Sequence, residues 1–138
     1  MVPLEFADVA EAEALLRGVV AFKFSDTEES DMYAGSPPFA GAARNLFAGI
    51  VKAHEESGNA GRAESWRRTY DLTRNDPVFA FVARYAARHP RWETLSAAER
   101  RDWLETVASP YRVDDDAAMR LIAAVDDRRA APQPPERP

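Results

Sequence analysis

The stretch Asp76–Pro90, DPVFAFVARYAARHP, constrains the fold more than any other part of the chain. Asp76 is expected to cap a helix, because its carboxylate can accept the free amide protons of a first helical turn. Pro77 suits the first helical position, where its missing N–H has no intrahelical partner to lose. Pro90 disfavours helical geometry at His89 and therefore ends the segment. These signals predict a helix that runs from Pro77 to His89.

On a helical wheel, this segment is apolar over most of its circumference, and only Arg84 and Arg88 form a charged sector. A helix of this kind needs neighbouring elements on several sides. The run VFAFV would also suit a strand, since short apolar runs do not distinguish a strand from a buried helix. The length of the segment, its alanine content and its paired stop signals favour a central buried helix.

Similar capping signals predict five further helices. Their expected first-turn caps are Asp8, Ser36, Asn59, Ser96 and Asp114, and Ser96 with Glu99 forms a capping-box pattern. The segment Val19–Phe24 alternates well enough to be a strand, but it has no convincing partner strand, so we expect it to continue the first helix. Residues 25–38 are acidic, rich in Ser and Thr and closed by Gly and Pro, and we expect a loop there. Ala42, Gly49 and Ala53 form a strip of small residues suited to a close helix crossing.

These elements predict an all-α fold, a compact bundle of about five to six short helices. We expect a single helical domain over residues 1–129. The remainder, residues 130–138, is rich in proline and is expected to be a flexible tail.

The composition excludes several functional classes. The chain has no cysteine, which removes disulfides, thiolate zinc sites and Cys nucleophiles. The start of the chain lacks the basic and apolar regions of a signal peptide, and no apolar run is long enough to span a bilayer. We therefore expect a soluble, cytoplasmic protein without membrane contact. Of the 18 basic residues 16 are arginine, which indicates a GC-rich bacterial genome rather than a function.

The net charge of −5 is unevenly distributed along the chain. Residues 1–60 carry 4 basic and 10 acidic side chains, whereas residues 61–101 carry 9 basic and 5 acidic ones. The basic middle could form an anion-binding face. The alternative, which we prefer, is that the segments neutralise each other in the folded protein.

Only two histidines, His54 and His89, could serve a metal or an enzymatic centre. Both lie on apolar faces near expected helix C-termini, where the helix dipole favours the charged imidazolium and works against metal ligation. No zincin spacing, serine nucleophile elbow or phosphate-binding glycine loop is present. We therefore expect no catalytic residue, no metal and no cofactor, and an enzyme or metal protein using His54 and His89 is the least favoured hypothesis.

Arginine and aromatic side chains alternate in the basic middle of the chain, a combination that can hold phosphates and stack bases. Within this part, the candidate binding residues are Arg62, Trp66, Arg67, Arg68, Arg74, Arg84, Arg88 and Arg91. The apolar character of Pro77–His89 argues against a recognition helix in a DNA groove. The alternative function is therefore an accessory protein that binds the nucleic-acid backbone.

The favoured hypothesis is a small accessory or regulatory protein that acts by binding another protein. The hypothesis rests on the missing catalytic set and on the segregated charges. Met32 and Tyr33 interrupt the acidic loop and are additional candidate contacts, or they attach the loop to the core. The sequence does not indicate an oligomeric state.

Overall fold

The computed structural model describes residues 5–131 and is all-helical in that range, apart from one isolated pairing of extended residues. The predicted fold class is therefore confirmed. The described part contains seven α-helices, and two single 3₁₀ turns, η1 and η2, lie between them. In chain order the elements are α1 (Val9–Lys23), α2 (Glu28–Ala34), α3 (Pro37–Glu56), α4 (Ala60–Thr69), η1 (Leu72–Arg74), α5 (Asp76–Ala86), η2 (Trp92–Thr94), α6 (Ala97–Ala108) and α7 (Asp115–Ala130).

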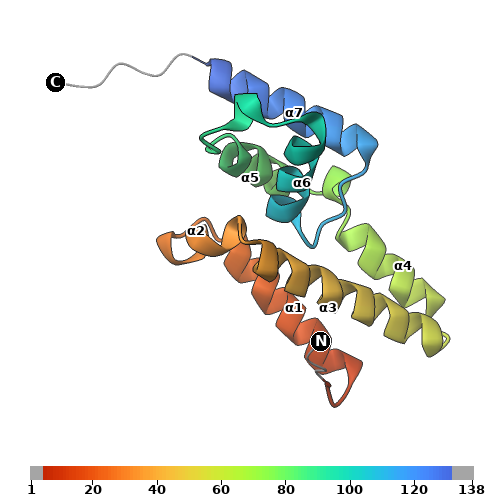
Figure 1. Cartoon of the computed structure of the whole chain (residues 1–138). Coiled ribbons are helices and arrows are strands. Elements are labelled where there is room, and N and C mark those ends of the chain that lie inside the picture. The colour runs from red at the N-terminus through yellow and green to blue at the C-terminus, as the bar shows by residue number, and fades with distance from the viewer. Residues whose placement is uncertain (1–4, 132–138) are drawn as a thin grey trace.

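The helices form two groups that follow the order of the chain (Figure 1). In the first group, the long helix α3 packs against α1 on one side and α4 on the other, and α2 lies beside the ends of α1 and α3. In the second group, α5 packs against both α6 and α7. Contacts between α3 and α6 join the two groups. A parallel pairing of Asp71 with Arg112 ties the end of α4 to the segment that precedes α7.

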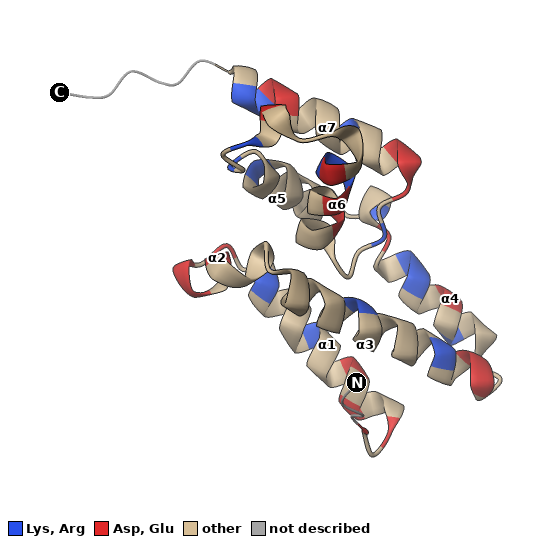
Figure 2. Ribbon diagram, in the orientation of Figure 1, with Lys and Arg blue, Asp and Glu red and all other residues tan. Residues whose placement is uncertain are grey.

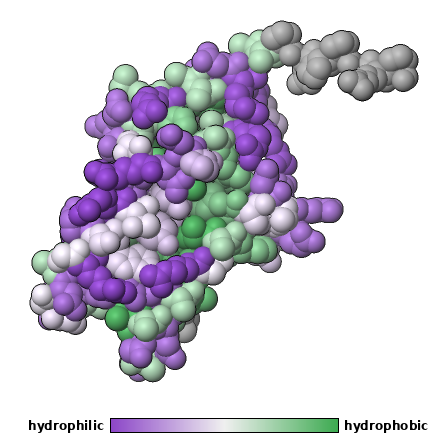
Figure 3. All heavy atoms as spheres, turned by 180° about the vertical axis from the view of Figure 1, so that it is seen from behind, coloured by the Kyte–Doolittle hydropathy of each residue, from purple (hydrophilic) through white to green (hydrophobic). Residues whose placement is uncertain are grey.

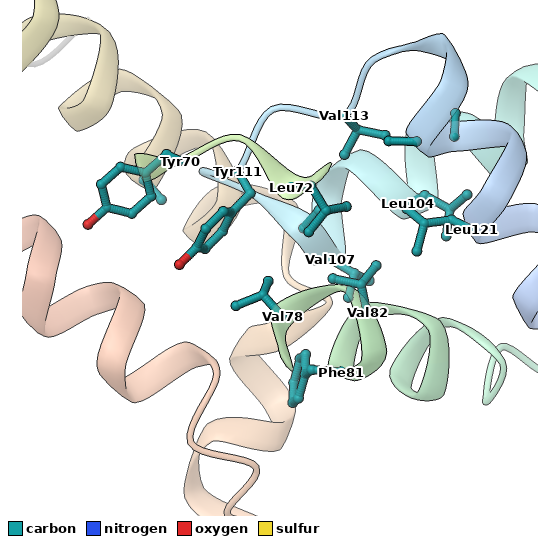
Figure 4. Packing of buried hydrophobic residues seen from close by; sticks show 14 of the residues in the cluster. Tyr70, Leu72, Val78, Phe81, Val82, Leu104, Val107, Tyr111, Val113 and Leu121 are labelled. Carbon is teal, nitrogen blue, oxygen red and sulfur yellow. The ribbon is translucent and has the colours of Figure 1, made fainter. Parts of the chain in front are cut away.

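One apolar core runs through both groups of helices. Around α5, Val78 and Val82 lie close to Val107 of α6 and Leu72 of η1 (Figure 4). Leu104 and Leu121 extend this packing toward α7. On the other side, Tyr70 and Tyr111 pack ring against ring at 5.1 Å and connect the core to α4. The predicted central helix therefore lies at the centre of the second group of helices, between α6 and α7.

Local capping signals predicted most helix starts correctly. The side chains of Asp8, Ser36, Ser96 and Asp114 each accept the expected amide hydrogen bond, and Ser96 with Glu99 forms the full capping box. Asn59 is the N-cap residue of α4, although its side chain makes no capping hydrogen bond.

The limits of the central helix were predicted incorrectly. Asn75 caps α5, because its side chain accepts the Val78 amide, and Asp76 is already helical. The helix ends at Ala86, so His89 lies in the following turn rather than on the helix.

The predicted loop at residues 25–38 contains the helix α2, which raises the number of α-helices above the expected five to six. Thr27 and Ser30 form a capping box, in which each side chain bonds the backbone amide of the other residue. Three acidic residues in the first turn further stabilise the helix, since they interact favourably with the positive end of its dipole. The segment Val19–Phe24 is helical up to Lys23, as expected.

The predicted Pro-rich tail lies almost entirely outside the described residues. Only its first two residues are described: Ala130 is the last residue of α7, and Ala131 caps the helix.

Lys23 is the most unusual member of the interior, because its side chain is fully buried. Its Nζ donates hydrogen bonds to the carbonyl oxygens of Thr106 at 2.8 Å and Ser109 at 2.7 Å, near the end of α6. The last carbonyls of a helix have no intrahelical donor, so the N–H groups of Lys23 satisfy them. Lys23 therefore joins the end of α1 to the end of α6.

Candidate functional site

An apolar groove of about 680 Å³ runs between α1 and α3 on the outside of the molecule. Its α1 wall includes Val9, Ala12 and Leu15, and its α3 wall runs from Ala42 to Ala53 through Leu46 and Gly49. Phe6 and Leu15 in this groove are 41% and 48% exposed, and the groove lining they share makes the exposed apolar surface contiguous.

The strip of small residues on α3 has a different environment from the expected one. Ala42 and Gly49 are exposed, and no helix among residues 5–131 crosses over them; the strip lines the open groove instead. A Cβ atom added at Gly49 would have no neighbour within 4 Å. No helix of residues 5–131 therefore makes the predicted close crossing over Ala42 and Gly49, and these small residues leave space on the surface.

Few charges interrupt the helices that form this groove, whereas acidic residues gather where α1 begins (Figure 2). Asp8 lines the groove, and the neighbouring Glu11 accepts the Ala7 amide. On α3, Lys52 and Glu56 pair with each other at 3.8 Å. Lys52 therefore pairs with Glu56 and does not neutralise the acidic side chains of Asp8 and Glu11.

Tyr33 and Met32 of α2 have different environments. The Tyr33 ring packs against Phe22 of α1 at 5.4 Å and Phe39 of α3 at 5.2 Å. Met32 is 74% exposed. Tyr33 therefore attaches α2 to the first group of helices, whereas Met32 remains available on the surface.

Four of the candidate arginines pair with acids from the first sixty residues. Arg62 pairs with Glu13, Arg67 with Glu55, Arg84 with Asp26 and Arg88 with Asp31. These are the contacts expected if the acidic and basic segments neutralise each other. Arg68, Arg74 and Arg91 make no ion pair with a described residue, and Trp66 is buried.

The arginine set is divided between different surfaces, because Arg62 and Arg67 lie on α4 whereas Arg84 and Arg88 lie on α5. Around the second pair, a hollow of about 420 Å³ is also lined by Arg128 and Arg129 of α7. Asp26 and Asp31 pair with the α5 arginines, and Glu93 binds Arg129 at 2.6 and 2.7 Å. Three carboxylates thus oppose four guanidinium groups, which leaves only about one positive charge.

A buried polar network lies at the far end of α3. His54 is only 4% exposed, and its Nε2 lies 3.0 Å from Glu13 Oε2 and 3.3 Å from Arg62 Nε. Arg62 also donates to both Glu13 oxygens, at 3.2 and 3.3 Å. Burial raises the pKa of the Glu13 carboxyl, but the hydrogen bonds from His54 and Arg62 outweigh it and hold that pKa below its ordinary value.

The two histidines have separate environments. His89 packs edge-on against Trp103 at 5.1 Å, and its Nδ1 accepts the Arg91 amide at 3.1 Å. His54 has Glu13 and Arg62 as its polar neighbours. No cluster of three or more metal-ligating side chains occurs within residues 5–131. Neither histidine therefore belongs to such a cluster.

The groove was not predicted from the sequence. The signal was present as Val9, Ala12 and Leu15, spaced three residues apart beside the small residues of α3. A helical wheel does not show which of these apolar residues pack against another helix and which remain exposed. Only the arrangement of α1 on α3 decides this.

Comparison with known proteins gives no relationship on which a function could be based. No protein-family model matches the chain, and neither the curated proteins nor the solved structures contain a significant match. None of the helices in the described part of the chain combines the length and the apolar character needed to cross a membrane.

Proposed function

We propose that the protein is a helical interaction module, and that the groove between α1 and α3 receives an amphipathic helix of another protein. The observation that carries the proposal is the groove itself, an apolar surface with Phe6 and Leu15 exposed in it. Contiguous apolar surface of this kind marks interaction sites in proteins. The face seen in Figure 3 likewise carries apolar surface across its middle, bordered by hydrophilic residues.

The dimensions of the groove suit a helix as the ligand. Its α3 wall from Ala42 to Ala53 covers eleven steps of the helix, or about 16 Å at 1.5 Å per residue. A three-turn helix has the same length, and it can place apolar residues at i, i+3, i+4 and i+7 into a groove of this kind. The small side chains Ala42 and Gly49 allow close approach of its backbone.

The charge at the end of the groove indicates what should flank the partner's apolar stripe. Asp8 and Glu11 make the start of α1 acidic, so lysine or arginine beside the apolar residues of the partner would be complementary. Such charges mainly set orientation and association rate, whereas the buried apolar contacts supply the affinity. The proposed partner is therefore a basic amphipathic helix.

The proposal is tested by comparing two variants that each place a charge on an exposed apolar residue. Leu15→Glu changes the groove, whereas Met119→Glu changes an exposed methionine of α7 outside it. Tagged wild-type protein and both variants are incubated with native cell extract, and bound proteins are crosslinked and identified by mass spectrometry. We expect a partner that crosslinks to the groove, is lost with Leu15→Glu and is retained with Met119→Glu.

Two results would contradict this assignment. One is a partner that binds all three proteins equally, since the groove would then not be the contact surface. The other is concentration-dependent self-association of the purified wild type that Leu15→Glu abolishes, since a second copy of the chain would then occupy the groove.

The alternative function, binding of a nucleic-acid backbone, stays a prediction. Its support is limited to Arg68, Arg74 and Arg91, because acids oppose the other four candidate arginines. The same extract tests it: nucleic acid bound to the protein should be released by moderate salt. Charge reversal at Arg68 and Arg74 that left such binding unchanged would contradict this function.

A further inference from the structure

A second pocket, smaller and more polar than the groove, lies between α1 and α4. Its volume is about 160 Å³, enough for several water molecules. It is lined by Arg17 from α1, by Arg62, Ser65, Trp66 and Thr69 from α4, and by Tyr70 at the end of α4. Two guanidinium groups and three hydroxyl groups therefore surround a space that suits a small polar ligand.

Arg17 is held in place without a charge partner. Its guanidinium lies over the Trp66 ring, 5.0 Å from the ring centroid, and it makes no ion pair with any carboxylate of residues 5–131. Stacking on an aromatic face uses the plane of the guanidinium and leaves the N–H groups at its edge available. Arg17 can therefore donate to a ligand in the pocket.

Arg62 is fixed from behind by the buried network at the end of α3. Its Nε faces His54, and its Nη2 donates to both oxygens of Glu13. The remaining nitrogen, Nη1, has no hydrogen-bond partner in the described part of the chain. The buried network thus orients one guanidinium edge and leaves the other for a ligand.

Hydroxyl groups complete the pocket. Thr69 uses its proton within the helix, where it donates to the Ser65 carbonyl at 2.9 Å. The hydroxyls of Ser65 and Tyr70 make no hydrogen bond to another described residue, and Figure 4 shows the Tyr70 hydroxyl pointing away from Leu104 and Leu121. Tyr70 and Arg17 both line the pocket. Burial raises the pKa of the Tyr70 phenol, and the charge of Arg17 opposes that shift.

We propose that this pocket binds a phosphate group, either as the free ion or as a phosphomonoester. Arg17 and Arg62 carry two positive charges, and Glu13, which pairs with Arg62, carries one negative charge. About one net positive charge therefore lies around the pocket and favours an anion. The donors come from two helices, and guanidinium groups bind phosphate oxygens through strong charge-assisted hydrogen bonds. Neither Arg17 nor Ser65 belongs to the helix-binding groove, so the site is independent of the function proposed above.

The test is a titration of the labelled, full-length protein with inorganic phosphate and, separately, with glycerol 3-phosphate. Sodium chloride at matched ionic strength serves as the reference. The indole N–H signals of the three tryptophans are followed by ¹H–¹⁵N correlation spectra. The Trp66 signal reports the pocket, because Trp66 lines it. Trp92 is the internal control: an arginine, Arg100, also stacks over its ring, at 4.8 Å, but neither residue lines the pocket.

We expect a saturable shift of the Trp66 signal with at least one phosphate ligand and little movement of Trp92. Saturation by both ligands would indicate that the pocket accepts monoesters, whereas saturation by inorganic phosphate alone would assign it to the free ion. Arg17→Gln should weaken binding by at least about tenfold, because it removes charge-assisted hydrogen bonds. Ser65→Ala should weaken it less.

Arg120→Gln is the matched control, since Arg120 is also exposed and stacks on an aromatic ring, Phe79, at 5.0 Å. The control should bind as the wild type does. The proposal is overturned if neither ligand produces a saturable shift of Trp66, or if Trp92 moves as much as Trp66. Equal weakening by Arg17→Gln and Arg120→Gln would also overturn it.

Discussion

Lys23 should make the stability of the protein rise with pH between about pH 7 and pH 9. Burial, with a smaller contribution from the charge of Arg44, lowers the pKa of the Lys23 ammonium from 10.5 to about 7. Between these two values, the unfolded chain carries a proton on this group that the folded protein has lost. The free energy of unfolding rises with pH wherever the unfolded state binds more protons than the folded state. As the pH increases, Lys23 becomes neutral in the folded protein, and the free-energy cost of burying its charge disappears.

The size of the effect follows from the width of this pH range. Each unit of pH between the two pKa values changes the free energy of unfolding by about 1.4 kcal/mol, so the change from pH 7 to pH 9 is roughly 2 kcal/mol. Below pH 7 the lysine becomes charged in both states, and its contribution levels off. The phenols of Tyr70, Tyr85 and Tyr111 have raised pKa values, so their effect is confined to pH above 9.

The assay is urea unfolding followed by tryptophan fluorescence at pH 7, 8 and 9. The difference between wild type and Lys23→Met isolates this group, since the methionine cannot titrate. We expect that difference to change by roughly 2 kcal/mol across the range. Lys52→Met serves as the control, because Lys52 is exposed and should leave the slope unaltered. Equal slopes in the wild type and Lys23→Met would refute the reasoning.

Two further substitutions test the packing and the buried network by the same unfolding assay. Gly35→Ala should lower the free energy of unfolding by about 1–3 kcal/mol, because a Cβ there would lie 2.7 Å from Trp103 Cη2. Gly41→Ala is the control and should be neutral or stabilising, because a Cβ at Gly41 would have no neighbour within 4 Å. Equal effects of the two substitutions would contradict this packing. Glu13→Ala should cost about 2–4 kcal/mol, because it leaves His54 buried without its carboxylate. Since the folded-state pKa of Glu13 is lowered from its ordinary value of 4.5, its charge-linked stabilisation is fully present above that value. It is lost as the pH falls below 4.5 and through the folded-state pKa. An effect of Glu13→Ala that stays constant as the pH falls below 4.5 would show that its charge is not responsible.

The features that were predicted from the sequence depend on residues three or four positions apart. The caps at Ser36 and Ser96 are local hydrogen bonds, so their sequence patterns are sufficient to identify them. The helix α2 was missed although its cap is equally local, because Ser30 replaces the glutamate of the usual capping box. An acidic, Ser-rich composition then favoured a loop.

The candidate site depends on contacts between residues far apart in the chain, which a helical wheel does not specify. Glu64 and Arg68 are four positions apart, as are Arg67 and Asp71, and this spacing favours ion pairs on a helix. Neither of these pairs is formed, because Arg67 binds Glu55 and Glu64 instead. Arg67 thus contacts a residue at the end of the preceding helix, which becomes its neighbour only after α3 and α4 pack. Arg17 was not a candidate at all, since it lies in the acidic part of the sequence.

The pairing between Asp71 and Arg112 has a consequence for the order of folding. It joins residues 41 positions apart and closes a loop that contains α5 and α6. Closing a flexible loop of this length is entropically costly, whereas α5 and α6 are neighbours in the chain and can pack first. The folding transition state should therefore contain the α5–α6 pair, and substitutions at Arg112 should mainly accelerate unfolding rather than slow folding.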